Sequence, residues 1–343
     1  MFKKVAALIL LAGSAAQLHA AEKLTVVSFG GDNKTAQEKA FYQPFAKQTG
    51  ATVQAAEYNG EMAKIKVMAD TGQTSWDVVE VESPELIRGC SEGLFEPLDW
   101  SKLGKREDFL DAAVTECGAG IFIWSTVLTY DSSKLTAAPT GWADFWDVQR
   151  FPGKRGLRRG AKFTLEFALL ADGVKQEDLY KVLGTKEGVD RAFRKLDQIK
   201  PNIQWWEAGA QPLQWLAAGD VVMTSAYNGR VATAQKEGRP FVMQWDGSLY
   251  DLDHWAIVKG SKNKALAEQF IAKANDPQHQ KVFAEAIPYG PTNTHTIDLI
   301  DPAIQPILPT APKNLENARA MDTEFWIDHG EELETRFNAW ASK

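Results

Sequence analysis

Arg230 lies in the first turn of an expected helix, within the segment Tyr227-Asn228-Gly229-Arg230. Residues 221–226 before it have strand composition, and Asn228-Gly229 is a turn sequence that can end a strand and start a helix. The first turn of a helix carries unpaired N–H groups and partial positive charge, so a cation there is unfavourable unless an anion lies beside it. Arg230 therefore predicts an anion-binding site. The alternative is an internal ion pair with one of the 45 acidic side chains.

Motifs of the common catalytic and cofactor sites do not occur in the sequence. There is no G-x-S-x-G, P-loop, G-x-G-x-x-G, C-x-x-C or H-E-x-x-H. We therefore expect a protein that is not an enzyme and needs no cofactor or metal. Two alternatives stay open: a secreted hydrolase that uses a carboxylate pair, and a ferric-ion-binding protein. The second would need clustered Tyr or His ligands, and the sequence contains no adjacent Tyr pair.

The first 20 residues have the pattern of a secretory signal peptide. Lys3 and Lys4 precede an apolar run, and small residues follow up to Ala20, where cleavage is expected although Leu18 occupies a position usually held by a small residue. No Cys follows the apolar run, which argues against a lipid anchor. The pattern predicts an exported, periplasmic protein, and we expect it to act as a monomer.

Charge and cysteine content narrow the partners and the compartment. The net charge is −7, or −9 once Lys3 and Lys4 are removed with the leader, which argues against nucleic acid or anionic lipid as the main partner. The chain has 343 residues, of which 44% are hydrophobic, enough to form two compact lobes. Because the compartment is oxidising, Cys90 and Cys117 are expected to form a disulfide.

Strands and helices alternate along the chain, which predicts an α/β fold with a mostly parallel sheet. The expected strands are residues 24–28, 51–56, 76–81, 203–206, 221–226 and 253–258. The expected helices are one that follows Gly31 and runs to Gly50, 62–69, one that starts at Ser83-Pro84 with Ser83 as N-cap, 164–171, 188–200, 213–218, one that starts near Asn228, and 264–274. No flexible linker separates the halves, so strands must cross between two lobes.

Ligands of open α/β sheets bind beyond the carboxyl ends of strands. Three such ends are visible, at residues 28–31, 82–84 and 227–230. A cleft between two lobes would bring them together. The alternatives at two of these ends are an N-cap role for Ser83 and a tight-turn role for Gly30-Gly31.

Five segments, in this order, resemble the spermidine/putrescine-binding group of bacterial periplasmic solute-binding proteins and its γ-aminobutyrate-binding relatives, which serve ABC transporters. They are SFGGDNKTAQEKAFYQPFAKQTGATV, WDVVEVESPELIRGCSEGLFEPLD, AYNGR, LDHWAIVKGSKNKALAEQFI and AIPYGPTN. The resemblance implies a type II two-lobed fold, in which each lobe has a central mixed sheet flanked by helices and the ligand binds between the lobes. It implies a first lobe of residues 21–128 and 254–305, a second of 129–253, and a helical segment, 306–343, that packs across both.

The resemblance also implies roles for single residues. In the polyamine-binding group an acidic residue at the position of Asp253 binds a ligand ammonium, and aromatic residues match Tyr227 and Tyr289. The γ-aminobutyrate-binding relatives carry an Arg and an Asp that match Arg230 and Asp253. The expected ligand-binding residues are Arg230, Asp253, Tyr227, Tyr289, Ser83, Trp206, Phe29 and Gly31. The alternatives are a turn or strand-end role for Asp253 and core packing for the aromatic residues.

One departure from the polyamine-binding group concerns the second ammonium of the ligand. The second acidic pair of that group falls near residues 158–163, where this chain has Arg158, Arg159 and Lys162. We interpret these three cations as a solvated patch, with a permease-docking role as the alternative. The resemblance thus implies a small zwitterion, γ-aminobutyrate or 5-aminovalerate, with its carboxylate on Arg230 and its ammonium on Asp253. Such a protein would deliver its ligand to a membrane ABC permease, and polyamine binding is the alternative.

Overall fold

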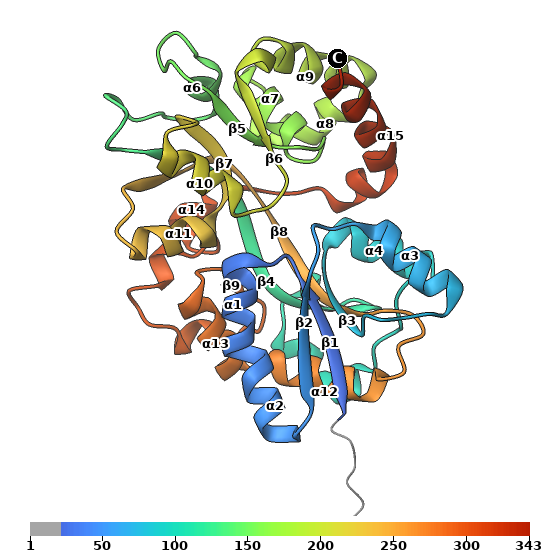
Figure 1. Ribbon diagram of the computed structural model, residues 1–343. Coiled ribbons are helices and arrows are strands. Elements are labelled where there is room, and N and C mark those ends of the chain that lie inside the picture. The colour runs from blue at the N-terminus through green and yellow to red at the C-terminus, as the bar shows by residue number, and fades with distance from the viewer. Residues whose placement is uncertain (1–21) are drawn as a thin grey trace, which may run out of the picture.

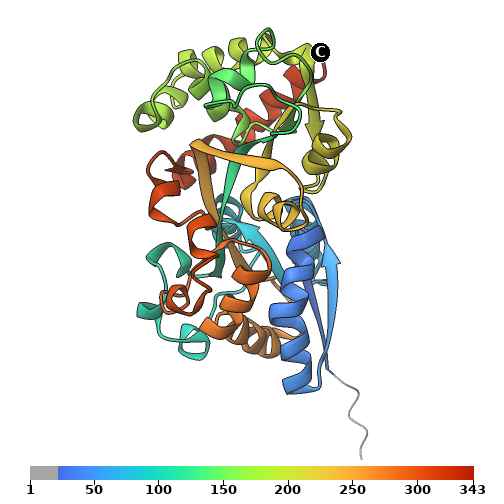
Figure 2. The same ribbon diagram turned by 90° about the vertical axis from the view of Figure 1, so that its left-hand side faces the viewer.

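The computed structural model describes residues 22–343, so the expected signal peptide lies outside the described residues. Two α/β lobes are stacked end to end (Figure 1), which confirms the expected two-lobed fold. The first strand, residues 23–28, begins at the far end of the first lobe, and the C-terminus lies at the far end of the second (Figure 2). Within residues 22–343 no helix is both long enough and apolar enough to cross a bilayer.

The first lobe contains three parallel strands with helices on both faces. Its strands are β1 (Lys23–Ser28), β2 (Thr52–Glu57) and β3 (Val78–Glu82), in the order β2-β1-β3. Its helices are α1 (Gly31–Gln37), which continues through a π-helical turn (Glu38–Tyr42) into α2 (Gln43–Thr49), then α3 (Met62–Thr71), α4 (Ser83–Ser91), α5 (Trp100–Leu103), α12 (Lys264–Ala274) and α13 (Pro277–Ala286).

The second lobe repeats this arrangement with different strands. Its parallel strands are β5 (Arg155–Arg158), β6 (Ile203–Trp206) and β7 (Met223–Tyr227). Its helices are α6 (Trp142–Trp146), α7 (Thr164–Ala171), α8 (Leu179–Leu183), α9 (Lys186–Asp197), α10 (Gln211–Ala218) and α11 (Asn228–Lys236). Three short elements complete the fold: β9 (Gly290–Pro291), α14 (Pro312–Leu315) and β10 (Arg319–Ala320).

Two long strands run through both lobes and join them. β4 (Gly118–Asp131) and β8 (Phe241–Ile257) pair antiparallel with each other over most of their length (Figure 1). All strands therefore belong to one sheet, in which β8 also pairs antiparallel with β3 and β4 with β7. The prediction of a mostly parallel sheet is wrong for its centre, because the two joining strands run in opposite directions.

Helix α15 (Thr323–Ala341) lies against the second lobe and also reaches α4 of the first (Figure 1). Trp326 donates a hydrogen bond to the buried Glu166 at 2.8 Å, and Trp340 packs edge-on against Trp205. The boundaries given above for the lobes and the C-terminal segment stay a prediction.

The disulfide between Cys90 and Cys117 is confirmed; it ties the end of α4 to the residue before β4. Replacing both cysteines by serine should lower the free energy of unfolding by about 3 kcal/mol, because the bridge restricts the unfolded chain. Denaturant unfolding of the double variant and of the oxidised protein measures this difference. A loss below about 1 kcal/mol would contradict the prediction. Neither cysteine lines the cavity described below, so ligand affinity should be unchanged.

Candidate functional site

A small cavity lies between the lobes, where β1, β3 and β7 end and where β4 and β8 pass. Residues from both lobes form its walls: Phe29, Asn33, Glu82, Phe122, Trp124, Tyr227, Arg230, Asp253 and Tyr289. Five of the eight predicted ligand-binding residues are among them, namely Phe29, Tyr227, Arg230, Asp253 and Tyr289. The three strand ends named from the sequence therefore do converge.

Arg230 lies in the first turn of α11 and is only 3% exposed, yet it has no acidic partner. Its Nη2 donates to the Gly30 carbonyl at 3.0 Å, and its Nε has no hydrogen-bond partner. No ion pair among residues 22–343 includes it, so the internal ion pair considered above is wrong. A buried guanidinium with an unused donor is costly unless an anion arrives to accept from it.

Arg155 shows what a structural buried arginine looks like in the same lobe. Its guanidinium donates to four backbone carbonyls, those of Phe145, Asp147, Gly153 and Phe151. Those bonds satisfy the side chain without a ligand. Arg230 differs because part of its donor capacity remains free at a cavity wall.

Two glycines make room for the Arg230 side chain. A Cβ atom at Gly31 would lie 2.5 Å from Nη1, and one at Gly209 would lie 2.8 Å from Nε. Gly31 also has a φ of +58°, which side chains rarely adopt. Gly31 therefore supports Arg230 and does not itself line the cavity.

Asp253 lies inside β8 and is 4% exposed, so the turn or strand-end role is wrong. Its Oδ1 accepts a hydrogen bond from Trp124 Nε1 at 2.7 Å, and no ion pair among the described residues includes it. Burial, followed by the nearby carboxyl groups of Glu80, Glu82 and Asp251, raises the pKa of Asp253 well above its ordinary value. A cation bound beside Asp253 would favour its ionised form.

Glu82, the last residue of β3, carries the third charge on the cavity wall. It lies opposite Asp253 in the pairing of β3 with β8. Unlike Asp253 it is neutralised by the protein: Lys162 Nζ lies 2.5 Å from Glu82 Oε2 and Arg158 Nη1 lies 3.5 Å from Oε1. Burial raises the pKa of Glu82, but Lys162 and Arg158 outweigh burial and lower it.

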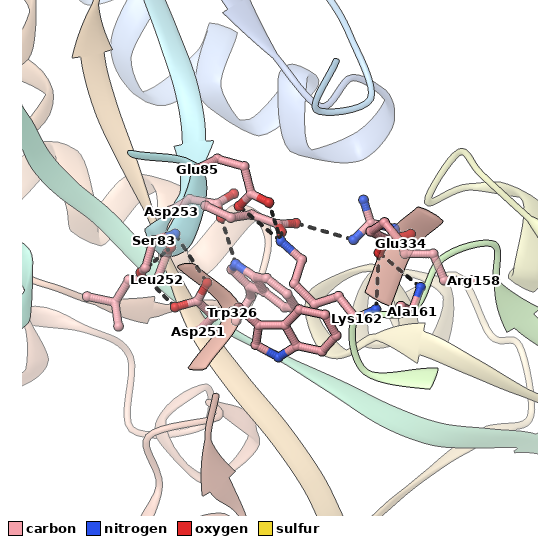
Figure 3. Close-up of polar contacts among 12 residues, drawn as sticks. Ser83, Glu85, Arg158, Ala161, Lys162, Asp251, Leu252, Asp253, Trp326 and Glu334 are labelled. Carbon is pink, nitrogen blue, oxygen red and sulfur yellow. Dashed lines mark hydrogen bonds and ion pairs between the residues drawn. The ribbon is translucent and has the colours of Figure 1, made fainter. Parts of the chain in front are cut away.

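These contacts correct the interpretation of the three cations as a solvated patch. Lys162 is 9% exposed, and its amino group extends from the second lobe towards Glu85 of the first (Figure 3). Arg158 is half-buried in the same network. The interpretation failed because the acidic partners lie far away in sequence: Glu82 is 76 residues before Arg158, and Glu85 is 77 residues before Lys162. Only Arg159, whose side chain is 50% exposed and lies 3.6 Å from Glu207, fits it.

Aromatic rings form the apolar walls between the charged groups. Tyr289 stacks on Phe122 with ring centroids 4.7 Å apart, and Tyr227 meets Trp124 edge-on at 5.1 Å. Gly229 lets Tyr289 approach α11, since a Cβ there would lie 2.6 Å from its ring. The cavity thus has a cation at Arg230, an unpaired carboxyl at Asp253 and an aromatic surface around them.

The family to which the sequence belongs can now be stated. Residues 40–310 match the model of a family described as bacterial extracellular solute-binding protein. The chain belongs to that family. Its members are binding proteins of transporters rather than enzymes, and they bind small ligands and deliver them to ABC permeases.

Individual relatives of this solute-binding protein differ in similarity. A γ-aminobutyric acid-binding protein of Pseudomonas aeruginosa is 64% identical over 333 residues, which are 97% of this chain and 95% of the relative. A solved structure of a GABA receptor is 34% identical with a TM-score of 0.83, over 94% of this chain and 98% of that one. A spermidine/putrescine-binding periplasmic protein of Escherichia coli is 24% identical over 275 residues, 76% of each chain.

Two further predicted contacts of this solute-binding protein lie outside the cavity. Ser83 is the first residue of α4, not its N-cap, and its hydroxyl donates to Asp251 at 2.7 Å. Trp206 donates to the Ser225 hydroxyl at 3.2 Å and packs edge-on against Tyr227. Both therefore support neighbouring groups: Ser83 those on β8, and Trp206 the Tyr227 ring.

Four cavity residues were not predicted: Asn33, Glu82, Phe122 and Trp124. Glu82 could have been found, because it ends a strand already named as a ligand-facing end. Phe122 and Trp124 lie in β4, which the sequence pattern did not reveal as a strand. Asn33 donates two hydrogen bonds to Glu80, one of the carboxyl groups that raise the pKa of Asp253, and no local signal in the sequence indicates that contact.

The ferric-ion alternative gains no support from the geometry. Residues 22–343 contain no cluster of three or more His, Cys, Asp or Glu side chains arranged to hold a metal ion. The acidic groups near the cavity are instead held by Lys162, Arg158 and hydrogen bonds from neighbouring side chains.

Proposed function

We propose that this protein binds a small ω-amino acid, γ-aminobutyrate or 5-aminovalerate, in the cavity between its lobes and delivers it to an ABC permease. One observation carries the proposal. Two buried groups of opposite charge, Arg230 and Asp253, line the same cavity and neither has an ion-pair partner among residues 22–343. A short zwitterion supplies one partner for each.

The ligand carboxylate would accept hydrogen bonds from the Arg230 guanidinium, and the first N–H groups of α11 would add to the positive field. The ligand ammonium would pair with Asp253, which Trp124 orients through its 2.7 Å hydrogen bond. Methylene groups between the two charges would contact the rings of Tyr227, Tyr289 and Phe29. Selectivity follows from the cost of leaving either buried charge without a partner.

Similarity supports an ω-amino acid more strongly than a polyamine. The relative that is 64% identical is named for γ-aminobutyric acid, and the polyamine-binding relative is 24% identical. The charges point the same way, because a diamine would place its second ammonium in a cavity that already contains the Arg230 cation.

The remaining features of the proposal concern transport. The leader pattern in residues 1–20 supports export to the periplasm, and the name of the E. coli relative includes that compartment. Wall residues come from both lobes, which supports closure of the lobes over the ligand as the signal that the permease reads. We further propose that the protein acts as a monomer, that it does not bind nucleic acid, and that the lobe boundaries are those given above.

Isothermal titration calorimetry tests the proposed ligand class. The mature protein is titrated with γ-aminobutyrate, 5-aminovalerate, putrescine, spermidine and an α-amino acid. Tight binding of one or both ω-amino acids, with weak or no response to the other three, is the expected result. Binding of the amines without any response to the amino acids would reject the proposal in favour of a polyamine carrier.

Affinity for the ω-amino acid should rise with pH, because its ammonium binds the ionised form of Asp253. The raised pKa of Asp253 in the empty site, caused first by burial and then by Glu80, Glu82 and Asp251, means that binding lowers this pKa and releases a proton. Titrations between about pH 5 and pH 8, in buffers of different ionisation enthalpy, measure that proton. Proton uptake, or an affinity independent of pH, would contradict the assignment of the ammonium to Asp253.

A further inference from the structure

Lys162 of the second lobe is buried against carboxylates of the first. Its Nζ lies 2.5 Å from Glu82 Oε2 and 2.8 Å from Glu85 Oε1, and Arg158 Nη1 reaches Glu82 from the same side. Figure 3 shows the Lys162 amino group directed at the Glu85 carboxylate. Burial lowers the pKa of Lys162, but Glu82 and Glu85 outweigh burial and raise it, so the side chain is charged.

The loop that carries Lys162 is held firmly in place. It joins β5 to α7, and the Glu334 carboxylate of α15 accepts hydrogen bonds from the backbone N–H groups of Ala161 at 2.9 Å and Lys162 at 3.2 Å (Figure 3). Phe163 has a φ of +67° and packs edge-on against Trp124 of the cavity wall. A non-glycine residue keeps this conformation only where its surroundings fix it. The contacts of this loop with Glu334 and Trp124 therefore hold Lys162 in the position from which it pairs with Glu82.

Of the two acidic residues that line the cavity, one is neutralised by cations of the protein and the other is not. Glu82 and Asp253 lie opposite each other on β3 and β8, and both line the cavity. Glu82 has the cations Lys162 and Arg158 as partners, whereas no ion pair among residues 22–343 includes Asp253. The walls thus offer one free carboxyl and one free cation, Arg230, to a ligand. With Glu82 unpaired they would offer two carboxyl groups.

We propose that Lys162 is a specificity-determining residue: it neutralises Glu82 with a cation of the protein, so that the cavity accepts one ligand ammonium and excludes diamines. Lys162 supplies the positive charge beside Glu82 that a second ligand ammonium would otherwise supply. This inference deepens the proposed function and rests on it. It adds a residue that the resemblance to known relatives did not predict as a ligand contact.

The test compares dissociation constants for γ-aminobutyrate and putrescine in the wild type and in three variants, Lys162→Met, Lys162→Gln and Lys162→Arg. In Lys162→Met and Lys162→Gln the ratio of the two constants should shift towards putrescine by about tenfold or more, because Glu82 loses its main counter-charge. Lys162→Arg keeps the charge and should keep the ratio. Adding Glu82→Gln to Lys162→Gln removes the carboxylate that has lost its counter-charge and should return the ratio to the wild-type value.

Lys102→Met is the matched control, since Lys102 pairs at 2.8 Å with a buried glutamate, Glu268, away from the cavity. It should leave the ratio unchanged. If Lys162→Met does not fold, as judged by thermal unfolding, the comparison of Lys162→Gln with Lys162→Arg still tests the proposal. An equal loss of affinity for both ligands in Lys162→Gln would overturn the proposal, because it would mean that Lys162 only holds the lobes together. An unchanged ratio would overturn it as well.

The same experiment separates this proposal from the proposed function. If the wild type binds neither γ-aminobutyrate nor 5-aminovalerate, the proposed function fails. A gain of putrescine affinity in Lys162→Gln, lost again with Glu82→Gln, would still support the role of Lys162.

Discussion

Replacing Arg230 by methionine should weaken binding of γ-aminobutyrate by about 100-fold or more, because the ligand carboxylate loses its only charged partner in the cavity. Methionine fills similar space without charge. Calorimetry measures the change. A diamine should bind the variant at least as well as the wild type, since the cation that repels its second ammonium is gone.

Two further variants separate the charge of Arg230 from its shape and from general damage. Arg230→Lys keeps the charge but not the parallel N–H donors of the guanidinium, so its affinity for γ-aminobutyrate should lie between those of Arg230→Met and the wild type. Arg336→Met is the control: Arg336 lies on α15 and pairs with Asp190 at 2.6 Å, away from the cavity, and its loss should leave affinity unchanged. Equal weakening of amino acid and diamine by Arg230→Met would show that Arg230 acts by holding the Gly30 carbonyl and not by binding a carboxylate.

Replacing Asp253 by asparagine should also weaken ω-amino acid binding by about 100-fold or more, while leaving the empty protein at least as stable. Asparagine keeps an oxygen that can accept from Trp124, and it removes a carboxyl group whose ionisation is opposed by burial and by Glu80, Glu82 and Asp251. Loss of binding without loss of stability is typical of a residue kept for a ligand.

The sign of the stability change follows from the raised pKa of Asp253. A carboxyl whose pKa is higher in the folded than in the unfolded chain favours folding at low pH, and that contribution is lost as the pH rises through the folded pKa. The gain in Asp253→Asn should therefore be present at neutral pH and vanish in acid. Thermal unfolding at both pH values measures it.

Asp251→Asn is the matched control for Asp253→Asn. Asp251 lies two residues away on β8, is 4% exposed, and has a pKa that is raised to about 7, mainly by burial. It differs from Asp253 because it accepts a hydrogen bond from Ser83 and does not line the cavity. We expect only a small effect of Asp251→Asn on affinity. If Asp253→Asn destabilises the protein at neutral pH and Asp251→Asn weakens binding equally, the special role of Asp253 is wrong.

Local signals in the sequence were sufficient for much of the fold. The predicted ranges 164–171, 203–206 and 264–274 coincide with α7, β6 and α12, and α11 begins at Asn228 as the Asn-Gly turn indicates. Each of these elements has its own periodicity, turn or capping residues. Arg230 in a first helical turn was correctly placed for the same reason.

The features that the sequence did not reveal depend on long-range contacts. Every residue of β4 is buried, so it lacks the alternation that marks a strand, and β8 extends twelve residues before its predicted start. Ser83 has the sequence signature of an N-cap, but its hydroxyl donates a hydrogen bond to Asp251 on β8. In the sequence Lys162 resembles a surface cation, because the α15 residue that fixes its loop and the Glu82 carboxylate of the first lobe are both distant along the chain.

The most direct measurement is a crystal structure of the mature protein with γ-aminobutyrate or 5-aminovalerate, whichever binds more tightly. We predict the ligand carboxylate about 3 Å from the Arg230 guanidinium and the ammonium about 3 Å from the Asp253 carboxylate, with Glu82 still paired to Lys162. A ligand bound in the reverse direction, or outside the cavity between the lobes, would contradict the account.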